Sequence, residues 1–177
     1  MNKQNSSLFR LFRKIFPHFL RITLPIILLL ILFHFVLAVH YSTTESMEPT
    51  LSPYDIAVFN KLAYVQKSPQ RGDIIVFRMP DTSEYYCKRI IAIGGDEVEF
   101  IDGSVYLNGK KIDESAYLPT KQKTYCMKKF KVPANHYFLL GDNRDVSFDS
   151  RYWAYPYITV SDIEGKYLCT LPFQKNH

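Results

Sequence analysis

The sequence places a serine where a nucleophile can act. Ser46 lies between Glu45 and Met47 in the stretch TTESMEPTLS, a few residues after a long apolar run. Pro49 disfavours a helical conformation at Glu48 and cannot donate a backbone hydrogen bond, so we expect a turn or an extended edge that exposes the serine in a cleft. A serine hydroxyl is a weak nucleophile at neutral pH and needs a base. The alternative is an ordinary linker serine that caps a turn.

Two kinds of base are available to this serine. His40 and His136 are candidates for a Ser-His-Asp triad, but neither lies in a segment with catalytic patterning. A lysine acts as a base only when burial among apolar groups keeps its amine uncharged part of the time. In EYYCKRIIAIGGD, read as a strand, Lys88 and Arg89 point to opposite faces, so Lys88 can enter an apolar site while Arg89 finds an acid elsewhere. The alternative is a lysine stem that lies along the surface of a strand.

A polar loop follows the apolar residues YFLL. In GDNRDVSFDSRYW, glycine, aspartate and asparagine favour a tight loop, and charge-assisted hydrogen bonds can join its acids and arginines. We expect this loop to orient the catalytic side chains. Its charged residues are Asp142, Arg144, Asp145, Asp149 and Arg151.

The elements that must position these residues are short strands. Beyond residue 52, runs rich in Val, Ile, Tyr and Phe are separated by Gly, Pro, Asn and Asp, which is typical of β structure. Asp102-Gly103 and Asn108-Gly109 predict two hairpin turns. Long helical periods are absent, so the sequence predicts a mainly β fold, in which a compact, mostly antiparallel β domain follows one transmembrane helix. The predicted strands are Asp55–Phe59, Ile74–Arg78, Tyr85–Ile93, Glu97–Ile101, Ser104–Leu107, Tyr137–Leu140 and Lys166–Leu171.

An apolar run precedes this domain. Residues 22–39, ITLPIILLLILFHFVLAV, are 18 residues without a formal charge, close to the ~20 that cross a bilayer as a helix. No polar face recurs at the helical period, which argues against a buried core helix. A cleaved signal peptide is the alternative, but its apolar region is usually shorter, and LAVHYS offers no clean cleavage site. We expect an uncleaved anchor over 22–39, a basic cytoplasmic tail over 1–21 and a catalytic domain over 40–177 on the outer side.

The net charge of +5 lies in the N-terminal tail. Residues 1–21 carry five cations and no acid, and removing these five from the 22 Lys and Arg leaves 17, equal to the 17 Asp and Glu. Because the remaining chain has no overall positive field, we expect no nucleic-acid partner. The segment 113–131 is polar and basic, and we expect a flap or extended hairpin whose lysines are solvated.

The cysteines and histidines indicate neither a metal nor a cofactor. Cys87, Cys126 and Cys169 are expected on the outer side, where disulfides can form, and their odd number leaves at least one thiol unpaired in a monomer. No C-x-x-C or Cys/His spacing is typical of zinc, and the five histidines are scattered. We therefore expect no metal and no cofactor.

Together these segments resemble the type I signal peptidases, also called leader peptidases, which are Ser/Lys serine proteases. The similarity lies in the order and spacing of SMEPTL at 46–51, RGDIIVF at 71–77, KRIIAIGGD at 88–96 and GDNRDVSFDSR at 141–151. One such motif is weak support, but four in order behind an apolar run are specific. The resemblance implies a serine endopeptidase of the bacterial inner membrane that removes signal peptides from exported precursor proteins, with these signal peptides and membrane lipid as its partners.

The resemblance also implies roles for individual residues. Ser46 would attack the scissile carbonyl, and neutral Lys88 would take the hydroxyl proton and return it to the leaving amine. The Ser46 amide and the Thr44 hydroxyl would form the oxyanion hole, and Ser147 would hydrogen-bond the lysine. The implied supporting residues are Asp142, Arg89, Asp149 and Arg151, and the implied substrate-binding residues are Met47, Leu51 and Tyr86.

The sequence departs from the family pattern at several positions. Gly94 stands where many relatives have proline, which is expected to loosen that turn. Val146 replaces a frequent asparagine and Phe148 is bulkier than the usual small residue, so we expect their loop to pack differently. His40 and Ser42 are more polar than the apolar residues common there, so the resemblance does not fix the preference near the cleavage site.

Alternatives remain open within and outside this family. A specialised relative that processes a dedicated substrate, in conjugative transfer or pilin maturation, would share the motifs, and organelle inner-membrane peptidases are also similar. The signal peptidases of the eukaryotic endoplasmic reticulum resemble this pattern but have histidine in place of the lysine. Self-cleaving repressors use a Ser/Lys pair but carry a helix-turn-helix domain where this chain has an apolar run. A membrane-anchored β module that binds without cleaving is the alternative from a different class.

Overall fold

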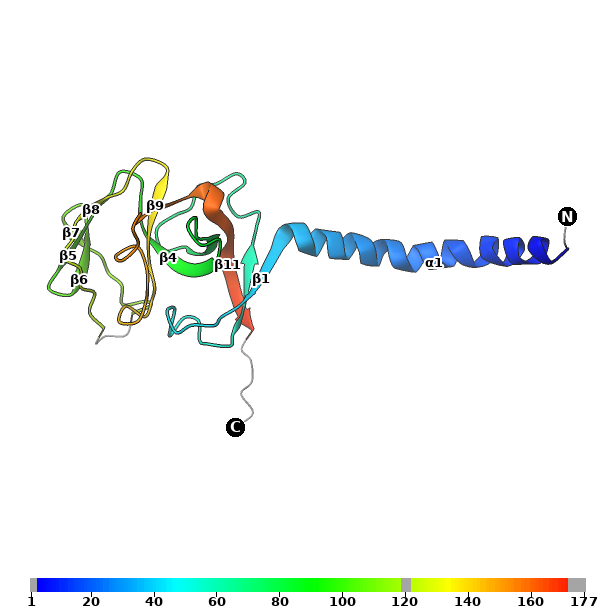
Figure 1. The fold of residues 1–177 in the computed structure, drawn as a ribbon, viewed down its shortest axis with the longest axis horizontal. Helices are drawn as coiled ribbons and strands as arrows, with labels where there is room; N and C mark the ends of the chain where they lie inside the picture. The colour runs from blue at the N-terminus through cyan, green and yellow to red at the C-terminus, as the bar shows by residue number, and fades with distance from the viewer. Residues whose placement is uncertain (1–2, 119–121, 172–177) are drawn as a thin grey trace, which may run out of the picture. The chain divides into compact units, whose positions relative to one another are not determined.

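The chain forms two compact units in the computed structural model, Met1–Val36 and Leu37–His177. The structure describes residues 3–118 and 122–171. The first unit consists of one helix, and the second, called the β domain, consists mainly of short strands (Figure 1). The predicted fold class, mainly antiparallel β with one N-terminal apolar helix, is confirmed.

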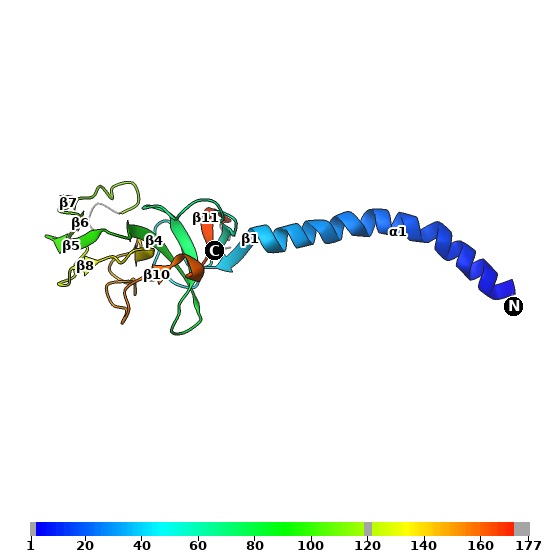
Figure 2. The same ribbon diagram turned by 90° about the horizontal axis from the view of Figure 1, so that it is seen from above.

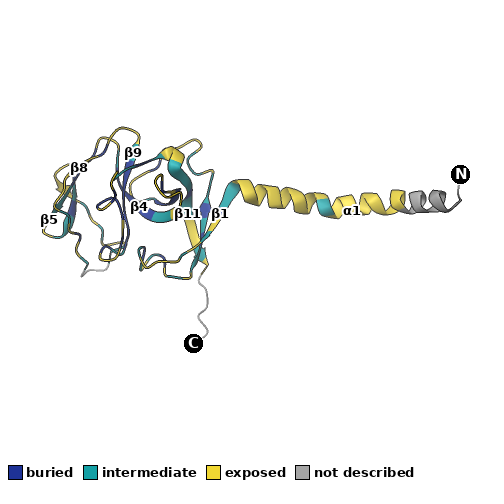
Figure 3. Ribbon diagram, viewed as in Figure 1, coloured by how far each residue is buried: buried dark blue, intermediate teal, exposed yellow. Residues whose placement is uncertain are grey.

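Helix α1 spans Lys3–Val36. Its segment Phe12–Val36 has 25 residues and a mean hydropathy of 2.4, and the side chains along it are almost all exposed (Figure 3). By length and composition, such a helix can cross a membrane. The helix continues through Pro17 and Pro25 and curves along its length (Figure 2), as expected where proline removes an intrahelical hydrogen bond.

The helix ends earlier than the apolar run predicted over residues 22–39. It stops at Val36, and Leu37–Tyr41 forms strand β1, which pairs antiparallel with β2, Ile56–Asn60. Leucine, alanine and valine are apolar in a helix and in a strand, so hydropathy alone does not separate the two. The backbone of β2 offers these residues a hydrogen-bonding partner, and this pairing decides the boundary.

A seven-stranded antiparallel sheet forms the main part of the β domain. Its strand order is β1-β2-β11-β3-β4-β9-β10, so strands distant in the sequence become neighbours. Strand β4 lies between β3 and β9, and its residues from Lys88 to Ala92 are buried. The remaining bounds are β3 Ile74–Arg78, β4 Tyr85–Ile93, β9 His136–Leu140, β10 Ile158–Thr159 and β11 Ile163–Leu171, with the 3-10 helix η1 at Val160–Asp162.

A four-stranded sheet completes the β domain. Its order is β7-β6-β5-β8, and it lies at the end of the domain away from β1 and β11 in Figures 1 and 2. The hairpin turns predicted at Asp102-Gly103 and Asn108-Gly109 are confirmed, because all four residues have positive φ and each turn joins paired strands. The bounds are β5 Glu97–Ile101, β6 Ser104–Leu107, β7 Lys110–Lys111 and β8 Phe130–Lys131.

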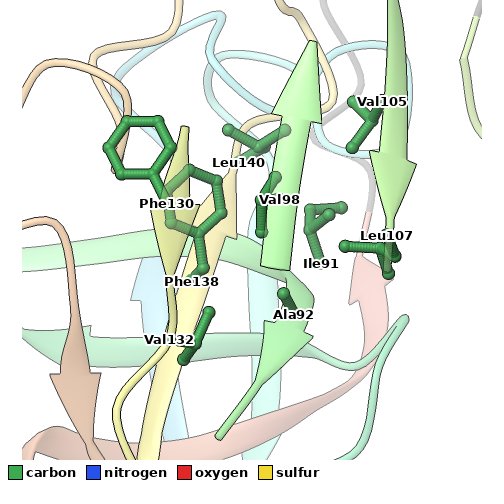
Figure 4. Packing of buried hydrophobic residues seen from close by; sticks show 9 residues of the cluster. All are labelled: Ile91, Ala92, Val98, Val105, Leu107, Phe130, Val132, Phe138 and Leu140. Atoms are coloured by element: carbon green, nitrogen blue, oxygen red, sulfur yellow. The ribbon is translucent and has the colours of Figure 1, made fainter. Parts of the chain in front are cut away.

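Apolar side chains from both sheets pack into one cluster (Figure 4). The rings of Phe130 and Phe138 lie 4.7 Å apart between centroids. Burial of such side chains is the main source of stability in a domain of this size. The cluster fixes the small sheet against β4 and β9, so β4 is held on this face as well as by its strand partners. Its members are Ile91, Ala92, Val98, Val105, Leu107, Phe130, Val132, Phe138 and Leu140.

The segment predicted as a flap has several parts. Residues 119–121 lie outside the described part of the chain. Residues 115–118 form a turn, and Phe130–Lys131 belongs to β8, which pairs with β5. The described residues between them contain no regular element.

Gly94 does not mark a loose turn. A Cβ at this position would lie 2.9 Å from Pro133 O and 2.9 Å from Asn135 N, which is closer than side-chain carbons approach backbone atoms. Glycine is therefore required because two backbone segments approach closely here. A proline, as in many relatives, does not fit this arrangement.

Candidate active site

Ser46 lies in a turn that connects β1 to β2. Residues 46–50 form the turn, and the Leu51 N–H donates to Met47 O at 2.9 Å. Met47 and Leu51 are only 2% and 1% exposed and pack in the core beneath β2 and β3. Because these two side chains fix the turn from below, Ser46 is held at the edge of the core.

Lys88 projects from β4 toward this turn. Its Nζ lies 2.6 Å from Ser46 Oγ, within hydrogen-bond distance, and the residue is only 3% exposed. Burial lowers the pKa of Lys88 below the ordinary lysine value, because a charged amine loses its hydration there. A larger fraction of the amine is then uncharged at a given pH, and an uncharged amine can accept a hydroxyl proton.

Two further groups fix the position of Ser46. Thr44 Oγ1 lies 3.1 Å from Ser46 Oγ, and Thr44 is exposed. The Asn143 N–H donates to Ser46 O at 3.1 Å. The hydroxyl of Ser46 therefore lies between Thr44 and Lys88, while its carbonyl is bound by the polar loop at 141–151.

A cleft of about 340 Å³ opens beside Ser46 and Lys88. Met47, Leu51 and Tyr86, the three residues predicted to bind substrate, all line it. Because Met47 and Leu51 are almost inaccessible, they form its floor, and an apolar floor accepts small uncharged side chains. Other lining residues are Ala57, Phe59, Val76, His40, Tyr85, Val146 and Phe148.

The buried Asp142 joins the turn that contains Ser46 to β4. Nε and Nη2 of Arg89 donate to its two carboxylate oxygens, each at 2.7 Å, and the Thr50 hydroxyl donates to Oδ2. Asp142 has no exposed surface. Arg89 points away from Lys88, as the alternation of a strand predicts. The bidentate pair thus fixes Thr50, and with it the turn that contains Ser46, relative to β4.

A second buried ion pair closes the loop at 141–151 on itself. Arg151 Nε and Nη2 donate to Asp149 Oδ1 and Oδ2 at 2.8 and 3.0 Å, and the Gly141 N–H donates to Asp149 Oδ2 at 3.1 Å. Arg151 Nη2 also donates to Arg144 O at 2.8 Å. These bonds hold the two ends of the loop together.

Ser147 lies in this loop but does not make the hydrogen bond that the resemblance implies. It is 3% exposed, and its Oγ has no hydrogen-bond partner among the described residues. The position of Ser147 depends on Gly141, because a Cβ at residue 141 would overlap both Ser147 Oγ and Ser46 O. The absence of a side chain at Gly141 lets Ser147 pack close to the turn that contains Ser46.

Cys87 also lines the cleft, next to Lys88. Burial raises the pKa of its thiol to about 12, so Cys87 remains protonated at neutral pH and supplies no thiolate nucleophile. All three cysteines are among the described residues, and all are free thiols. No disulfide joins any two of them within the chain.

Several residues of the site were not identified from the sequence. Thr50 and Asn143 lie within the recognised motifs but received no role, although they contact Asp142 and Ser46. Glu114 and Tyr117 come from the predicted flap and contact buried arginines. These contacts join residues far apart in the sequence, 30 positions for Glu114 and Arg144 and 92 for Thr50 and Asp142, so no local periodicity predicts them.

The geometry defines the class of the site. Hydrolysis by an activated serine needs a hydroxyl, a base within hydrogen-bond reach and a groove for the bond that is cut. The cleft brings the three together, as a serine hydrolase requires. The model of a family described as signal peptidase, peptidase S26, matches residues 15–171, and the chain belongs to this family of serine endopeptidases.

Two relatives agree with this assignment in sequence, and one solved structure covers part of the chain. A probable signal peptidase I-2 from Synechocystis sp. is 40% identical over 127 residues, which cover 68% of this chain and 57% of that protein. A signal peptidase IB from Staphylococcus aureus (strain COL) is 32% identical over 170 residues, 87% of each chain. A signal peptidase I from Enterococcus faecalis V583, known from a crystal structure, is 32% identical in sequence. The structural match has a TM-score of 0.46 and covers 56% of this chain and 97% of that chain. The match therefore spans little more than half the length of the Synechocystis relative.

Proposed function

We propose that this chain is a membrane-anchored serine endopeptidase that removes signal peptides from exported precursor proteins. Membership of the signal peptidase family supports the reaction class. The observation that carries the proposal is the 2.6 Å separation between Lys88 Nζ and Ser46 Oγ at a buried position. This pair supplies both a nucleophile and its base at the edge of an apolar cleft.

In the proposed reaction, Lys88 is the general base and Ser46 is the nucleophile. Neutral Nζ takes the hydroxyl proton as Oγ bonds to the scissile carbonyl carbon, and the resulting ammonium gives this proton to the leaving amine nitrogen when the C–N bond breaks. The acyl group then remains on Oγ. The amine, neutral again, activates a water molecule that hydrolyses the ester and restores the hydroxyl.

Negative charge develops on the carbonyl oxygen during both halves of this reaction. We assign the Ser46 N–H and the Thr44 hydroxyl as donors to this oxygen, because Thr44 Oγ1 already lies 3.1 Å from the attacking atom. Met47, Leu51 and Tyr86 are assigned to the substrate side chains that precede the cut. Residues assigned to positioning are Arg89, Asp142, Asp149 and Arg151.

The proposed location is the bacterial plasma membrane. The apolar segment of α1 supports a single span, and the five cations of residues 1–21 support a cytoplasmic N-terminus by the positive-inside rule. The catalytic domain, from His40 onward, would then face the outer side. Its partners there would be membrane lipid and the signal peptides of exported precursors.

Purified full-length protein in detergent micelles is expected to cut a secretory precursor once, at the end of its signal peptide. Electrophoresis detects the cut, and N-terminal sequencing of the product identifies the bond. The matched control is the same precursor with tryptophan in place of the small residue before the cut, which tests whether the cleft selects small side chains. Equal cleavage of both precursors, or cuts scattered through the mature part, would contradict the proposal.

The cleavage rate is expected to rise with pH. The uncharged fraction of Lys88 grows as pH increases through its pKa, and burial places this pKa below the ordinary lysine value of about 10.4. The carboxylates of Asp142 and Asp149 oppose this lowering and Arg151 assists it, but burial dominates. Turnover should therefore increase with pH and level off before about 10.4. Rates measured across this range, with circular dichroism to verify folding, test the base, and a flat profile contradicts it.

A further inference from the structure

One turn in the segment 113–131 holds the side chains of Glu114 and Tyr117 together. The N–H groups of Tyr117 and Leu118 donate to Glu114 O at 3.1 and 2.9 Å, and the Asp113 carboxylate accepts the Ser115 N–H at 3.0 Å. The Tyr117 hydroxyl donates to Glu114 Oε1 at 2.8 Å. Glu114 and Tyr117 therefore form one preorganised unit, and each contacts a different arginine of the active-site region.

Tyr117 covers Arg89. The guanidinium carbon lies 4.0 Å from the centre of the tyrosine ring, and the Arg89 side chain is only 11% exposed. A cation over a ring face is attracted by it, and the ring excludes water from that side of the guanidinium. The other edge of Arg89 binds Asp142, which accepts the Thr50 hydroxyl in the turn that contains Ser46. Tyr117 is thus connected to the nucleophile through an unbroken series of contacts.

Glu114 contacts a second arginine, Arg144. Both terminal nitrogens of Arg144 donate to its carboxylate, and the two side chains are 0% and 9% exposed, respectively. Arg144 Nε donates to Gly141 O at 2.9 Å. Gly141 is the residue whose missing side chain lets Ser46 O and Ser147 approach each other. Glu114 is therefore connected, through Arg144 and then Gly141, to the carbonyl of Ser46.

A third contact from the same segment reinforces this connection. Gln122 Nε2 donates to Asn143 Oδ1 at 2.7 Å, and the Asn143 N–H donates to Ser46 O. Thr124 Oγ1 accepts a hydrogen bond from Arg144 at 2.6 Å. The segment therefore contacts Asn143 and Arg144 of the polar loop, and Asn143 binds the Ser46 carbonyl directly.

Stability alone does not explain these buried charges. A buried ion pair loses its hydration, and well-packed apolar residues of similar volume often give equal or greater stability. What an ion pair adds is a fixed geometry, because two hydrogen bonds between planar groups define both distance and orientation. Arg89 and Arg144 both use this geometry, as Arg151 does with Asp149.

We propose that Glu114 and Tyr117 are positioning residues that hold the Ser46 turn and the loop at 141–151 in register with Lys88. They act through Arg89 and Arg144 and do not touch the reacting atoms. This inference rests on the proposed function. It predicts that loss of either side chain slows the chemical step, while substrate binding in the apolar cleft is preserved.

The first test removes the ring of Tyr117 in the full-length protein. Tyr117→Leu is expected to lower kcat for precursor cleavage by about ten- to a hundredfold, because a small misplacement of reacting groups has effects of this size, and to leave KM within about twofold. Tyr117→Phe keeps the ring over Arg89 and should restore kcat to within about threefold of the original. The matched control is Tyr125→Leu, on the same segment, because Tyr125 is 61% exposed and its replacement should leave kcat unchanged.

The second test alters Glu114. Glu114→Gln keeps an oxygen for Arg144 but removes the charge, so kcat should fall by several-fold, about 1.4 kcal/mol for each factor of ten. Glu97→Ala, which removes an exposed acid of β5, is the matched control. If Tyr117→Leu does not fold, Glu114→Gln tests the proposal alone.

The outcomes separate this proposal from the proposed function. If the unmodified protein cuts no precursor, the proposed function fails. If it cuts and Tyr117→Leu and Glu114→Gln retain its kcat, the function stands and the positioning role is wrong. A lower melting temperature with unchanged kcat well below that temperature, or a change in KM alone, also overturns the positioning role.

Discussion

Ser46→Ala and Lys88→Ala are each expected to abolish precursor cleavage while the β domain stays folded. The first removes the attacking oxygen, and the second removes the amine 2.6 Å from it. General-base catalysis contributes about 10²- to 10⁴-fold, and loss of the nucleophile costs at least as much, so we expect both rates to fall by roughly 10³-fold or more. Single-turnover cleavage of a radiolabelled precursor by the full-length variants measures this loss.

A double variant and an exposed lysine provide the controls. Residues that act as one unit are not additive, so the Ser46→Ala/Lys88→Ala variant should be no slower than either single variant. Lys128 is exposed, and Lys128→Ala should cleave at the original rate. Normal processing by either single variant would show that Ser46 and Lys88 are not the catalytic pair.

The strands that were predicted with the correct bounds have strong local signals. Tyr85–Ile93 combines aromatic and β-branched residues, and Glu97–Ile101 and Ser104–Leu107 are joined by a turn that favours positive φ. Strands without such signals were missed. Leu37–Tyr41 is continuous with an apolar run, and Phe130–Lys131 is a strand only because it pairs with β5. Pairing with a distant partner is a tertiary property that a local pattern does not contain.

The same distinction applies to the site. Motif spacing and strand alternation led to Ser46, Lys88 and Arg89, and the structure brings the first two together although they are 42 residues apart. Their roles in catalysis stay predictions. The contacts of Glu114 and Tyr117 were not foreseen, because a basic segment with no periodicity gives no reason to bury an acid or a ring. Ser147 Oγ has no hydrogen-bond partner among the described residues because of how the loop at 141–151 packs, and the spacing of motifs in the sequence does not define that packing.

Asp142→Ala is expected to destabilise the β domain by about 3–5 kcal/mol, the usual cost of breaking a buried ion pair. Asp142 is completely buried and pairs with Arg89, so the substitution leaves a buried guanidinium without its acid and also removes the acceptor of Thr50. Since small domains are stable by only about 5–15 kcal/mol, this is a large fraction of the total. Trp153, the single tryptophan of the chain and 6% exposed, provides a fluorescence signal for urea unfolding of the full-length protein.

Three further variants, Glu99→Ala, Arg89→Ala and the double variant Arg89→Ala/Asp142→Ala, identify the cause of this loss. Glu99→Ala removes the partner of Lys129 at the surface, where ion pairs contribute little, and should hardly change the unfolding midpoint. Arg89→Ala combined with Asp142→Ala leaves no unpaired charge, so the double variant should lose less stability than the sum of the two single variants. If Asp142→Ala were as mild as Glu99→Ala, or if the two single losses simply added, the pair would not be what fixes the Ser46 turn to β4. The orientation of the nucleophile would then have to come from the hydrogen bond between the Asn143 N–H and Ser46 O and from the packing of Met47 and Leu51.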